Sequence, residues 1–243
     1  MKKNNNTLSN SLFTKIIASL MVFAFAVGSA LALPGTTSAN LNTTTGVTTS
    51  VNGSTLSITA PDKAVLTWQA FGSGADTIAL TDTLNYALPA KNSSVLNIVA
   101  GGASTTIDGS ITSNGNVFVL NPNGIIVGGG ARIDVNAFYL GTSDIPAFAS
   151  YYFQQNGKLP SQDGLASLAG SAAVNTGAII KVGDNITIAS KNINVAGAFV
   201  QGNLVLNGDG NVSLGSSGFA YVDGNVNASN ATGGTLIGSA GNS

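Results

Sequence analysis

Every carboxylate side chain in this sequence belongs to aspartate, because the ten acidic residues include no glutamate. The 243 residues also include no histidine and no cysteine. These absences exclude a Ser-His-Asp triad, a cysteine nucleophile, a histidine or cysteine zinc site and a glutamate acid/base pair. A polysaccharide lyase or hydrolase with a β-helix fold would use clustered aspartates with Ca²⁺ or a lone arginine, and the candidate residues are Asp108, Asp134 and Arg132.

The sequence around these three residues favours turn and surface positions over a catalytic site. Asp108 precedes Gly109 in a turn dipeptide, and Asp134 alternates with aliphatic residues, as an outward-facing strand residue does. No two aspartates are adjacent or separated by a single residue. Residues 208–211 resemble one calcium-binding repeat, but the nonapeptide pattern does not recur. We therefore predict no enzyme activity, cofactor or metal, with a secreted β-helix polysaccharide lyase or hydrolase as the alternative.

The segment Asn121-Pro-Asn-Gly-Ile125 combines residue types that restrict the conformation of the backbone. Pro122 has no N–H group, so it fits the second position of a β-turn and not the middle of a strand. Asn123 or Gly124 can then adopt the left-handed conformation, and the side-chain amides of Asn121 and Asn123 can close local hydrogen bonds. The segment predicts a rigid corner between two strands.

Short apolar runs separated by Gly, Asn, Asp or Ser are the elements that must position this corner. Each run alternates apolar and polar side chains over a few residues, which predicts a β-strand. The composition agrees, because 31 glycines and 8% charged residues disfavour helices, and 44% hydrophobic residues disfavour intrinsic disorder. The predicted strands are Leu56–Ile58, Val65–Leu66, Ile78–Leu80, Val95–Val99, Val117–Leu120, Ile125–Val127, Ile133–Val135, Ile186–Ile188, Ile193–Val195, Leu204–Leu206 and Val212–Leu214.

A sandwich, a barrel and a β-helix all use short strands, and the spacing favours the β-helix. Many links between the runs are too short for sandwich crossovers. In a parallel β-helix, like side chains stack one coil apart, and Gly and Asn form the corners. A loose 20-residue repeat of Ile179, Phe199 and Phe219 agrees with the length of one coil. We predict an all-β parallel β-helix, and no apolar stripe with helical spacing follows the N-terminal leader.

The first 32 residues have the pattern of a secretory signal peptide. Three lysines precede the apolar run Ile16–Val27, and Ala30–Ala32 matches a small-x-small cleavage site. The run is too short for a membrane span, which needs ~20 residues, and cleavage after Ala39 is an alternative. Residues 33–243 carry six basic and ten acidic side chains, a net charge of −4. That charge disfavours nucleic acids and anionic membranes as partners.

Two segments depart from the strand pattern. Residues 146–170 combine several aromatic side chains with a polar stretch, and we predict an excursion from the helix whose aromatics lie on the side of the coils. Residues 225–243 form a low-complexity end rich in Gly, Ser and Asn. Trp68 and Phe71 are predicted to pack in the cap or core and not to form a sugar platform, and Phe118 is predicted to pack likewise.

The corner and its surroundings resemble the two-partner secretion domain, or haemagglutination activity domain, of filamentous-haemagglutinin-type exoproteins. The signature is Asn-Pro-Asn-Gly-Ile at 121–125, and the resemblance runs from about Leu41 to Leu206. The family's second asparagine-proline-asparagine motif is absent upstream, where Asn92–Asn97 stands, as in one subgroup. Supporting segments are Trp68–Phe71, Ser94–Val99, Ile107–Ile111, Ala131–Val135, Gly141–Ile145, Tyr151–Phe153, Val174–Ile179 and Asp184–Ile188.

The resemblance implies a fold and a function. The family's domain is a right-handed parallel β-helix with an N-terminal cap, here 33–60 within a domain spanning 33–243. It addresses an exoprotein, exported unfolded by the Sec machinery, to an outer-membrane barrel transporter with POTRA domains, and it nucleates β-helix folding outside the cell. Asn121, Pro122, Asn123, Gly124 and Ile125 would form its secretion motif.

The same resemblance implies how the protein is used. We expect a monomeric, adhesin-like protein that passes through the periplasm and is secreted from, or displayed on, a Gram-negative cell. A host or cell-surface ligand is a further expected partner. A structural adhesin repeat without transporter recognition is the remaining alternative.

Overall fold

The computed structural model describes residues 41–43, 45–71, 76–143, 147–160, 170–175, 177–214, 220–229 and 239–240. The predicted signal peptide, residues 1–32, lies outside the described residues. The strands are β1 (Leu41–Thr43), β2 (Thr48–Asn52), β3 (Thr55–Thr59), β4 (Ala64–Trp68), β5 (Thr77–Ile78), β6 (Thr83–Ala87), β7 (Ser94–Val99), β8 (Thr105–Ile107), β9 (Ser110–Ser113), β10 (Asn116–Leu120), β11 (Ile125–Val127), β12 (Arg132–Val135), β13 (Ala137–Gly141), β14 (Ser171–Val174), β15 (Ile179–Ser190), β16 (Asn192–Val195), β17 (Phe199–Gly208), β18 (Val212–Leu214), β19 (Tyr221–Asp223), β20 (Val226–Ser229) and β21 (Ser239–Ala240).

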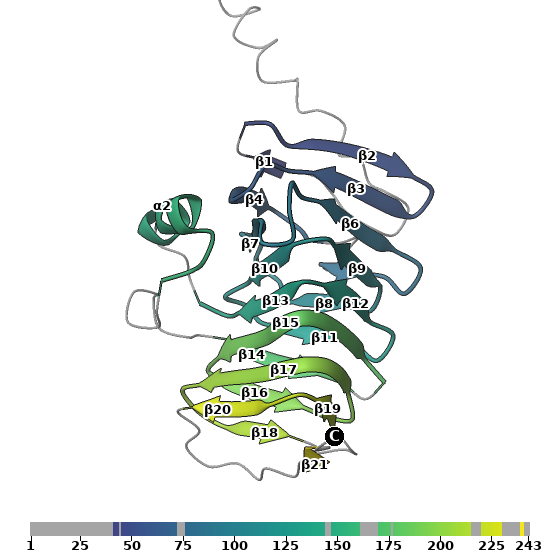
Figure 1. Cartoon of the computed structure of the whole chain (residues 1–243), viewed down its shortest axis with the longest axis vertical. Coiled ribbons are helices and arrows are strands. Elements are labelled where there is room, and N and C mark those ends of the chain that lie inside the picture. Colours follow the sequence, from purple (N-terminus) through teal and green to yellow (C-terminus); the bar gives the residue numbers. More distant parts are fainter. Residues whose placement is uncertain are drawn as a thin grey trace, which may run out of the picture. The chain divides into compact units, whose positions relative to one another are not determined.

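These strands stack as successive rungs of two curled sheets around one core (Figure 1). The larger sheet has 15 strands, and the smaller has six in the order β18-β16-β14-β11-β8-β5. In the smaller sheet each strand pairs in parallel with its equivalent one coil away, as Val127 does with Ile107 and with Val174. The predicted parallel β-helix is confirmed.

Like side chains stack along the helix axis and form the core. One buried column, in the larger sheet, contains Leu56, Leu84, Ile111, Ile133, Ile180, Val200 and Val222. A second, in the smaller sheet, contains Ile78, Ile107, Val127, Val174, Val195 and Leu214. Neighbouring strands lie about 4.8 Å apart, so each aliphatic side chain packs on the next. Burial of this stack stabilises the fold by ~25 cal/mol for each Å² of apolar surface removed from water.

The N-terminal end of the stack departs from parallel pairing. β1 runs antiparallel to β4, and β2 runs antiparallel to β3. β3 and β4 then pair in parallel with β6 and β7. The antiparallel strands therefore occupy the hydrogen-bonding edge that the first coil would otherwise present. β1, β2 and β3 all lie within the segment 33–60 that was predicted to form a cap.

β15 and β17 are long because each follows two faces of its coil. The first part of β15 pairs with β12 and the second part with β13. A register shift between Lys181 and Asn185 separates the two parts where β15 pairs with β17. Together these strands join two faces of the coils into the larger sheet.

The predicted strands lie in observed strands, with one partial exception. Only Ile78 of the run Ile78–Leu80 is in a strand, and Leu80 lies in a turn with 68% of its surface exposed. The 20-residue repeat is correct for Ile179 and Phe199, which are paired, but the next partner of Phe199 is Tyr221 and not Phe219. Phe219 lies outside the described residues. Coil length therefore varies, since the corners need not contain the same number of residues.

A helix within residues 146–170 is a feature that the sequence analysis did not predict. α2 (Ala147–Asn156) leaves the stack after β13 and lies beside it (Figure 1). Among the α2 residues whose burial is described, 149–156, Ala149 and Phe153 are the buried ones and lie one helical turn apart, a stripe too short to recognise in the sequence. Gly157 ends the helix with a positive φ of 66°. No helix in the described ranges has the length and apolarity to cross a bilayer.

The 121–125 corner as the candidate functional site

Residues 121–124 form the corner between β10 and β11. The backbone N–H of Gly124 donates to the carbonyl of Asn121 at 3.1 Å, which closes a β-turn with Pro122 in its second position. Of the two residues that the sequence left open, Gly124 takes the positive φ, at 118°. A side chain at 124 would be strained by that backbone conformation, so glycine is required for this corner.

The side chain of Asn121 is fully buried and joins this corner to the preceding coil. Its Nδ2 donates to the carbonyl of Ala103 and to Oγ1 of Thr105, both at 2.9 Å. Its Oδ1 accepts a hydrogen bond from the backbone N–H of Asn123 at 2.9 Å. The backbone N–H of Asn121 donates to the carbonyl of Gly141 in the following rung at 3.0 Å. Asn121 therefore holds three levels of the stack in register.

The neighbouring residues of the corner also contact both adjacent coils. On the exposed side, Nδ2 of Asn123 donates to the carbonyl of Gly101 at 2.8 Å. From the other side Gly170 packs directly on the turn, because a Cβ at that position would lie 2.8 Å from the carbonyl oxygen of Pro122. Ile125 begins β11 and is buried in the core. The corner is thus enclosed between the coil before it and the coil after it.

A column of buried polar side chains continues from Asn121 along the same edge of the helix. Leu120, Gly141 and Ala189 are paired in successive rungs, and each is followed by a fully buried polar residue: Asn121, Thr142 and Ser190. Oγ1 of Thr142 donates to Oγ of Ser190 at 2.8 Å, and Ser190 donates to the carbonyl of Gly170 at 3.1 Å. Sequence reasoning missed Thr142 and Ser190. The sequence pattern that could have identified Thr142 and Ser190 is a polar residue directly after each strand of the same face in successive coils.

A second buried amide, Asn97, lies inside the first coils and was also not assigned a role from the sequence. Its Oδ1 accepts hydrogen bonds from Nε1 of Trp68 at 3.0 Å and from the phenol of Tyr86 at 2.9 Å. Its Nδ2 donates to the carbonyl of Phe118 at 3.1 Å. Burial raises the pKa of the Tyr86 phenol well above its usual range, although the bond to Asn97 acts in the opposite direction. The core of the first coils therefore contains one satisfied polar cluster.

The aromatic residues predicted to pack in the cap or core lie in two places. Trp68 and Phe71 are fully buried in the central core, with ring centroids 5.4 Å apart in an edge-to-face arrangement. Phe118 lies instead in a cluster on the outer surface, stacked on Tyr139 at 5.5 Å and edge-on to Phe153 of α2 at 5.2 Å. Burial in that cluster raises the pKa of Tyr139 to about 12. Aromatic contacts between Phe153 and Phe118 therefore pack α2 against the outer face of the coils.

Arg132 and Asp134, two of the three residues considered for an enzyme site, bind different partners. The guanidinium of Arg132 donates to the backbone carbonyls of Gly130, Ala131 and Gly177. The carboxylate of Asp134 pairs with the ammonium of Lys181 at 3.4 Å. Asp108 lies at the corner between β8 and β9. Across the described residues, aspartates do not gather in the groups of three that a metal site would use.

A capped stack of parallel coils with a polar corner defines this protein as a β-solenoid. Residues 32–242 match the family described as the TPS secretion domain, where TPS stands for two-partner secretion. The chain belongs to this family. The family resemblance read from residues 121–125 and their surroundings is therefore confirmed.

Individual relatives agree with this assignment, and a solved structure agrees with the fold. The chain is 32% identical over 101 residues to a heme/hemopexin-binding protein of Haemophilus influenzae, which covers 40% of this chain and 10% of that protein. It is 35% identical over 78 residues to the protein of that name from strain Rd, covering 32% of this chain and 8% of the relative. The crystal structure of the HMW1 secretion domain from H. influenzae has a TM-score of 0.50 and 20% sequence identity, covering 80% of this chain and 64% of that chain. The aligned part is thus about a tenth of the curated relatives' length.

Proposed function

We propose that residues 32–242 are the address by which an exported exoprotein is delivered to a cognate outer-membrane barrel transporter. The observation that carries this proposal is membership of the TPS secretion domain family over residues 32–242. In this proposal the Sec machinery exports the chain, led by residues 1–32, and periplasmic POTRA domains of the transporter receive it unfolded. The protein is then secreted or held at the surface of a Gram-negative cell.

The physical properties of the chain suit such a route. It contains no cysteine, so no disulfide can lock it before it crosses the outer membrane. Its coils are built from neighbouring segments, so each coil can pack on the previous one as the chain emerges. Every added coil buries apolar surface, at ~25 cal/mol per Å², and this opposes movement back through the transporter.

Within this proposal the 121–125 corner nucleates the coil stack. Asn121 connects its own turn to the preceding coil through Ala103 and Thr105, and to the following rung through Gly141. A turn that fixes three levels at once restricts the register of every later coil. We therefore assign Asn121, Pro122, Asn123, Gly124 and Ile125 as the secretion motif.

A secretion assay tests this assignment. Cells that express the chain with its transporter should retain the Asn121→Ala/Asn123→Ala double variant in the periplasm, while the parent chain reaches the medium. Asn203→Ala is the matched control, because it also removes an amide of a later coil, where Nδ2 of Asn203 donates to Oδ1 of Asn185 at 3.1 Å. Secretion of the double variant at the parent level would rule out a role for the corner.

A further inference from the structure

The chain contains five Asn-Gly dipeptides, a sequence that can modify itself. They begin at Asn52, Asn114, Asn123, Asn156 and Asn207. Glycine has no side chain to shield its backbone nitrogen, so this nitrogen can attack the side-chain carbonyl carbon of the preceding asparagine. The new nitrogen–carbon bond closes a succinimide ring, and the amide nitrogen leaves as ammonia with the proton of the backbone N–H. Water from the solvent then opens the ring at either carbonyl and gives aspartate or isoaspartate.

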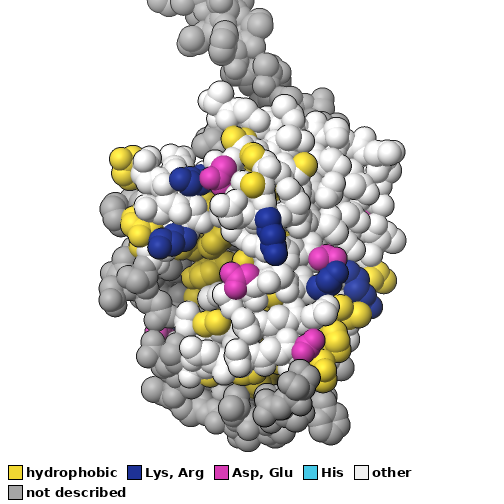
Figure 2. Space-filling model, in the orientation of Figure 1, with side chains coloured by type: hydrophobic (Ala, Val, Ile, Leu, Met, Phe, Trp, Pro, Cys, Tyr) yellow, Lys and Arg dark blue, Asp and Glu magenta, His cyan; other side chains and the backbone are white. Residues whose placement is uncertain are grey.

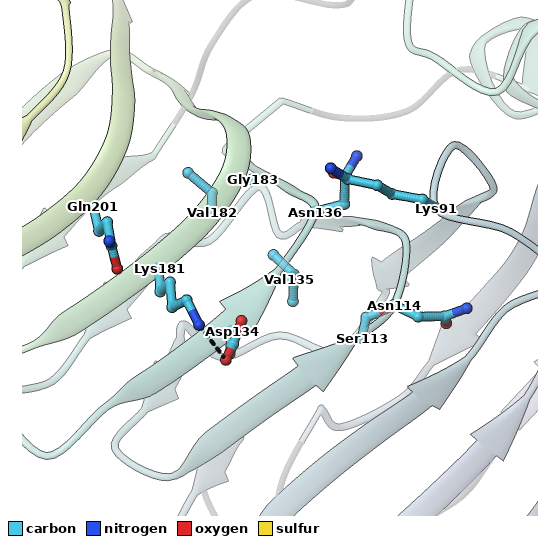
Figure 3. A pocket seen from close by; sticks show the side chains of 10 residues that line it. All are labelled: Lys91, Ser113, Asn114, Asp134, Val135, Asn136, Lys181, Val182, Gly183 and Gln201. Carbon is cyan, nitrogen blue, oxygen red and sulfur yellow. Dashed lines mark hydrogen bonds and ion pairs between the residues drawn. The ribbon is translucent and has the colours of Figure 1, made fainter.

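Asn114 shows that exposure of the side chain does not by itself permit this reaction. Its side chain is exposed and lines an open depression on the outer surface of the coils (Figure 3). Its Nδ2 nevertheless donates to the carbonyl of Leu88 at 2.6 Å, and its Oδ1 accepts from the backbone N–H of Leu88 at 2.8 Å. The backbone N–H of Gly115, which is buried, donates to Oγ of Ser113 at 3.0 Å. Both reacting groups are therefore held by other bonds.

Three further Asn-Gly dipeptides are also held in place. The backbone N–H of Gly124 donates to a carbonyl of the corner turn at 3.1 Å, and that of Gly157 donates to a carbonyl of α2 at 2.7 Å. The asparagine amides that precede these glycines donate to other backbone carbonyls at 2.8 and 2.9 Å. Asn207 and Gly208 lie within β17, where both are paired with β15 and Asn207 is also paired with β20. Each of these sites can react only after part of the coil stack or α2 opens.

Asn52 differs from the other four asparagines in each of these respects. It is exposed, it is the last residue of β2, and the turn residue Gly53 follows it. Among the residues that the structure describes, neither the side chain of Asn52 nor the backbone N–H of Gly53 has a hydrogen-bond partner. A Cβ built on Gly53 would have nothing within 4 Å, so solvent reaches the attacking nitrogen.

The movement that the attack requires is small at this site. Asn52 must leave its extended conformation, which breaks its pairing with Thr55 at the end of the hairpin. β2 pairs with β3 alone among the described strands, and all five of its residues are exposed, so its end can open without disturbing the core. The β3 side of the turn stays in place, because Oγ of Ser54 donates to the carbonyl of Thr81 in the next coil at 2.9 Å.

We propose that Asn52 is a self-modification site, which deamidates through a succinimide formed with Gly53. The carboxylate of the product is the first charge on this hairpin, because residues 48–59 contain no charged side chain. In Figure 2 the lysine and arginine side chains lie away from the upper right of the face, where Figure 1 places β2 and β3. The isoaspartyl product also adds one methylene group to the backbone of the turn, which weakens the pairing by which β2 covers the edge of β3.

Incubation of the folded, purified chain at mildly alkaline pH, followed by peptide mass spectrometry, tests the proposal. Asn52 should deamidate at least about tenfold faster than any of the other four asparagines, because only its site reacts through opening at the end of an edge strand. In urea the five rates should converge, since the protecting contacts are lost. Asn52→Gln should suppress the reaction at this position, because glutamine would have to close a larger ring.

Hydrogen exchange measures the effect of the modification on β2. After chromatographic separation, the isoaspartyl form should exchange the amides of β2 faster than the parent chain. The matched control is Asn52→Asp, which has the new charge on an ordinary backbone and should exchange as the parent does. Three results would overturn the proposal: no deamidation at Asn52, another Asn-Gly that reacts as fast in the folded chain, or the same ratio of rates in the folded and the unfolded chain. Exchange at the parent rate in the isoaspartyl form would exclude the effect on β2.

Discussion

Replacement of Asn121 by alanine should destabilise the fold far more than the same change at Asn123. Asn121→Ala removes two donated and two accepted hydrogen bonds, the accepted ones coming from the backbone N–H and from Nδ2 of Asn123. It also leaves the hydroxyl of Thr105, which is fully buried, without this partner. At about 1 kcal/mol for each lost bond, with a larger penalty for a buried group left unpaired, we expect a loss of about 3–4 kcal/mol. Asn123→Ala should cost about 1 kcal/mol or less, because water replaces its exposed bond to Gly101 and because Oδ1 of Asn121, which loses the bond from Nδ2 of Asn123, keeps the bond from the backbone N–H of residue 123.

Urea unfolding followed by the fluorescence of the single tryptophan measures both changes. Trp68 is fully buried in the first coils, so its emission reports loss of the core. Asn203→Ala is again the control, with an expected loss of about 1 kcal/mol, because its side-chain bonds to Asn185 and Asn225 lie near the surface. Equal losses for Asn121→Ala and Asn123→Ala would refute the reasoning, since burial of the Asn121 amide would then have no energetic consequence.

Three further predictions concern the core, the helix and pH. Asn97→Ala should cost about 3–5 kcal/mol in urea unfolding, because it leaves the buried indole N–H of Trp68 and phenol of Tyr86 unpaired; a loss below 1 kcal/mol would contradict this. Phe153→Ala should cost about 3 kcal/mol and reduce the helical circular dichroism signal, because it removes the buried anchor of α2; an unchanged midpoint would contradict it. Burial raises the folded-state pKa of Asp76 above its usual 3.8, so the native state keeps a proton that the unfolded state releases, and stability falls as pH rises above 3.8. Asp76→Asn should remove that part of the fall, which begins above pH 3.8, and an identical pH profile for the variant would exclude the assignment.

The strands were predictable because their signal is local. Apolar side chains alternate with polar ones in each short run, and the stacked columns repeat that pattern in every coil. The corner was predictable for the same reason, since Pro122 and Gly124 restrict the backbone without help from distant residues. The choice between Asn123 and Gly124 for the positive φ was left open, and the structure assigns it to Gly124.

Features that depend on contacts between coils were not predictable from one sequence. The helix α2 buries Ala149 and Phe153, and Phe153 packs in a cluster with apolar residues of the strands, so the support for this helix comes from distant parts of the chain. Asn97 looks like a polar interruption of an apolar run until Trp68 and Tyr86 are known to surround it. Phe118 alternates like its neighbours on β10, and the sequence does not indicate that α2 covers the outer face on which it lies. In each case the deciding partner is more than ten residues away in the chain.

The distribution of the chain between periplasm and medium, measured with and without the cognate transporter, tests the central proposal most directly. We predict that the protein accumulates in the medium or on the cell surface when the transporter is present and stays in the periplasm when it is absent. Export at the same level in both strains would show that residues 32–242 do not address the chain to that transporter.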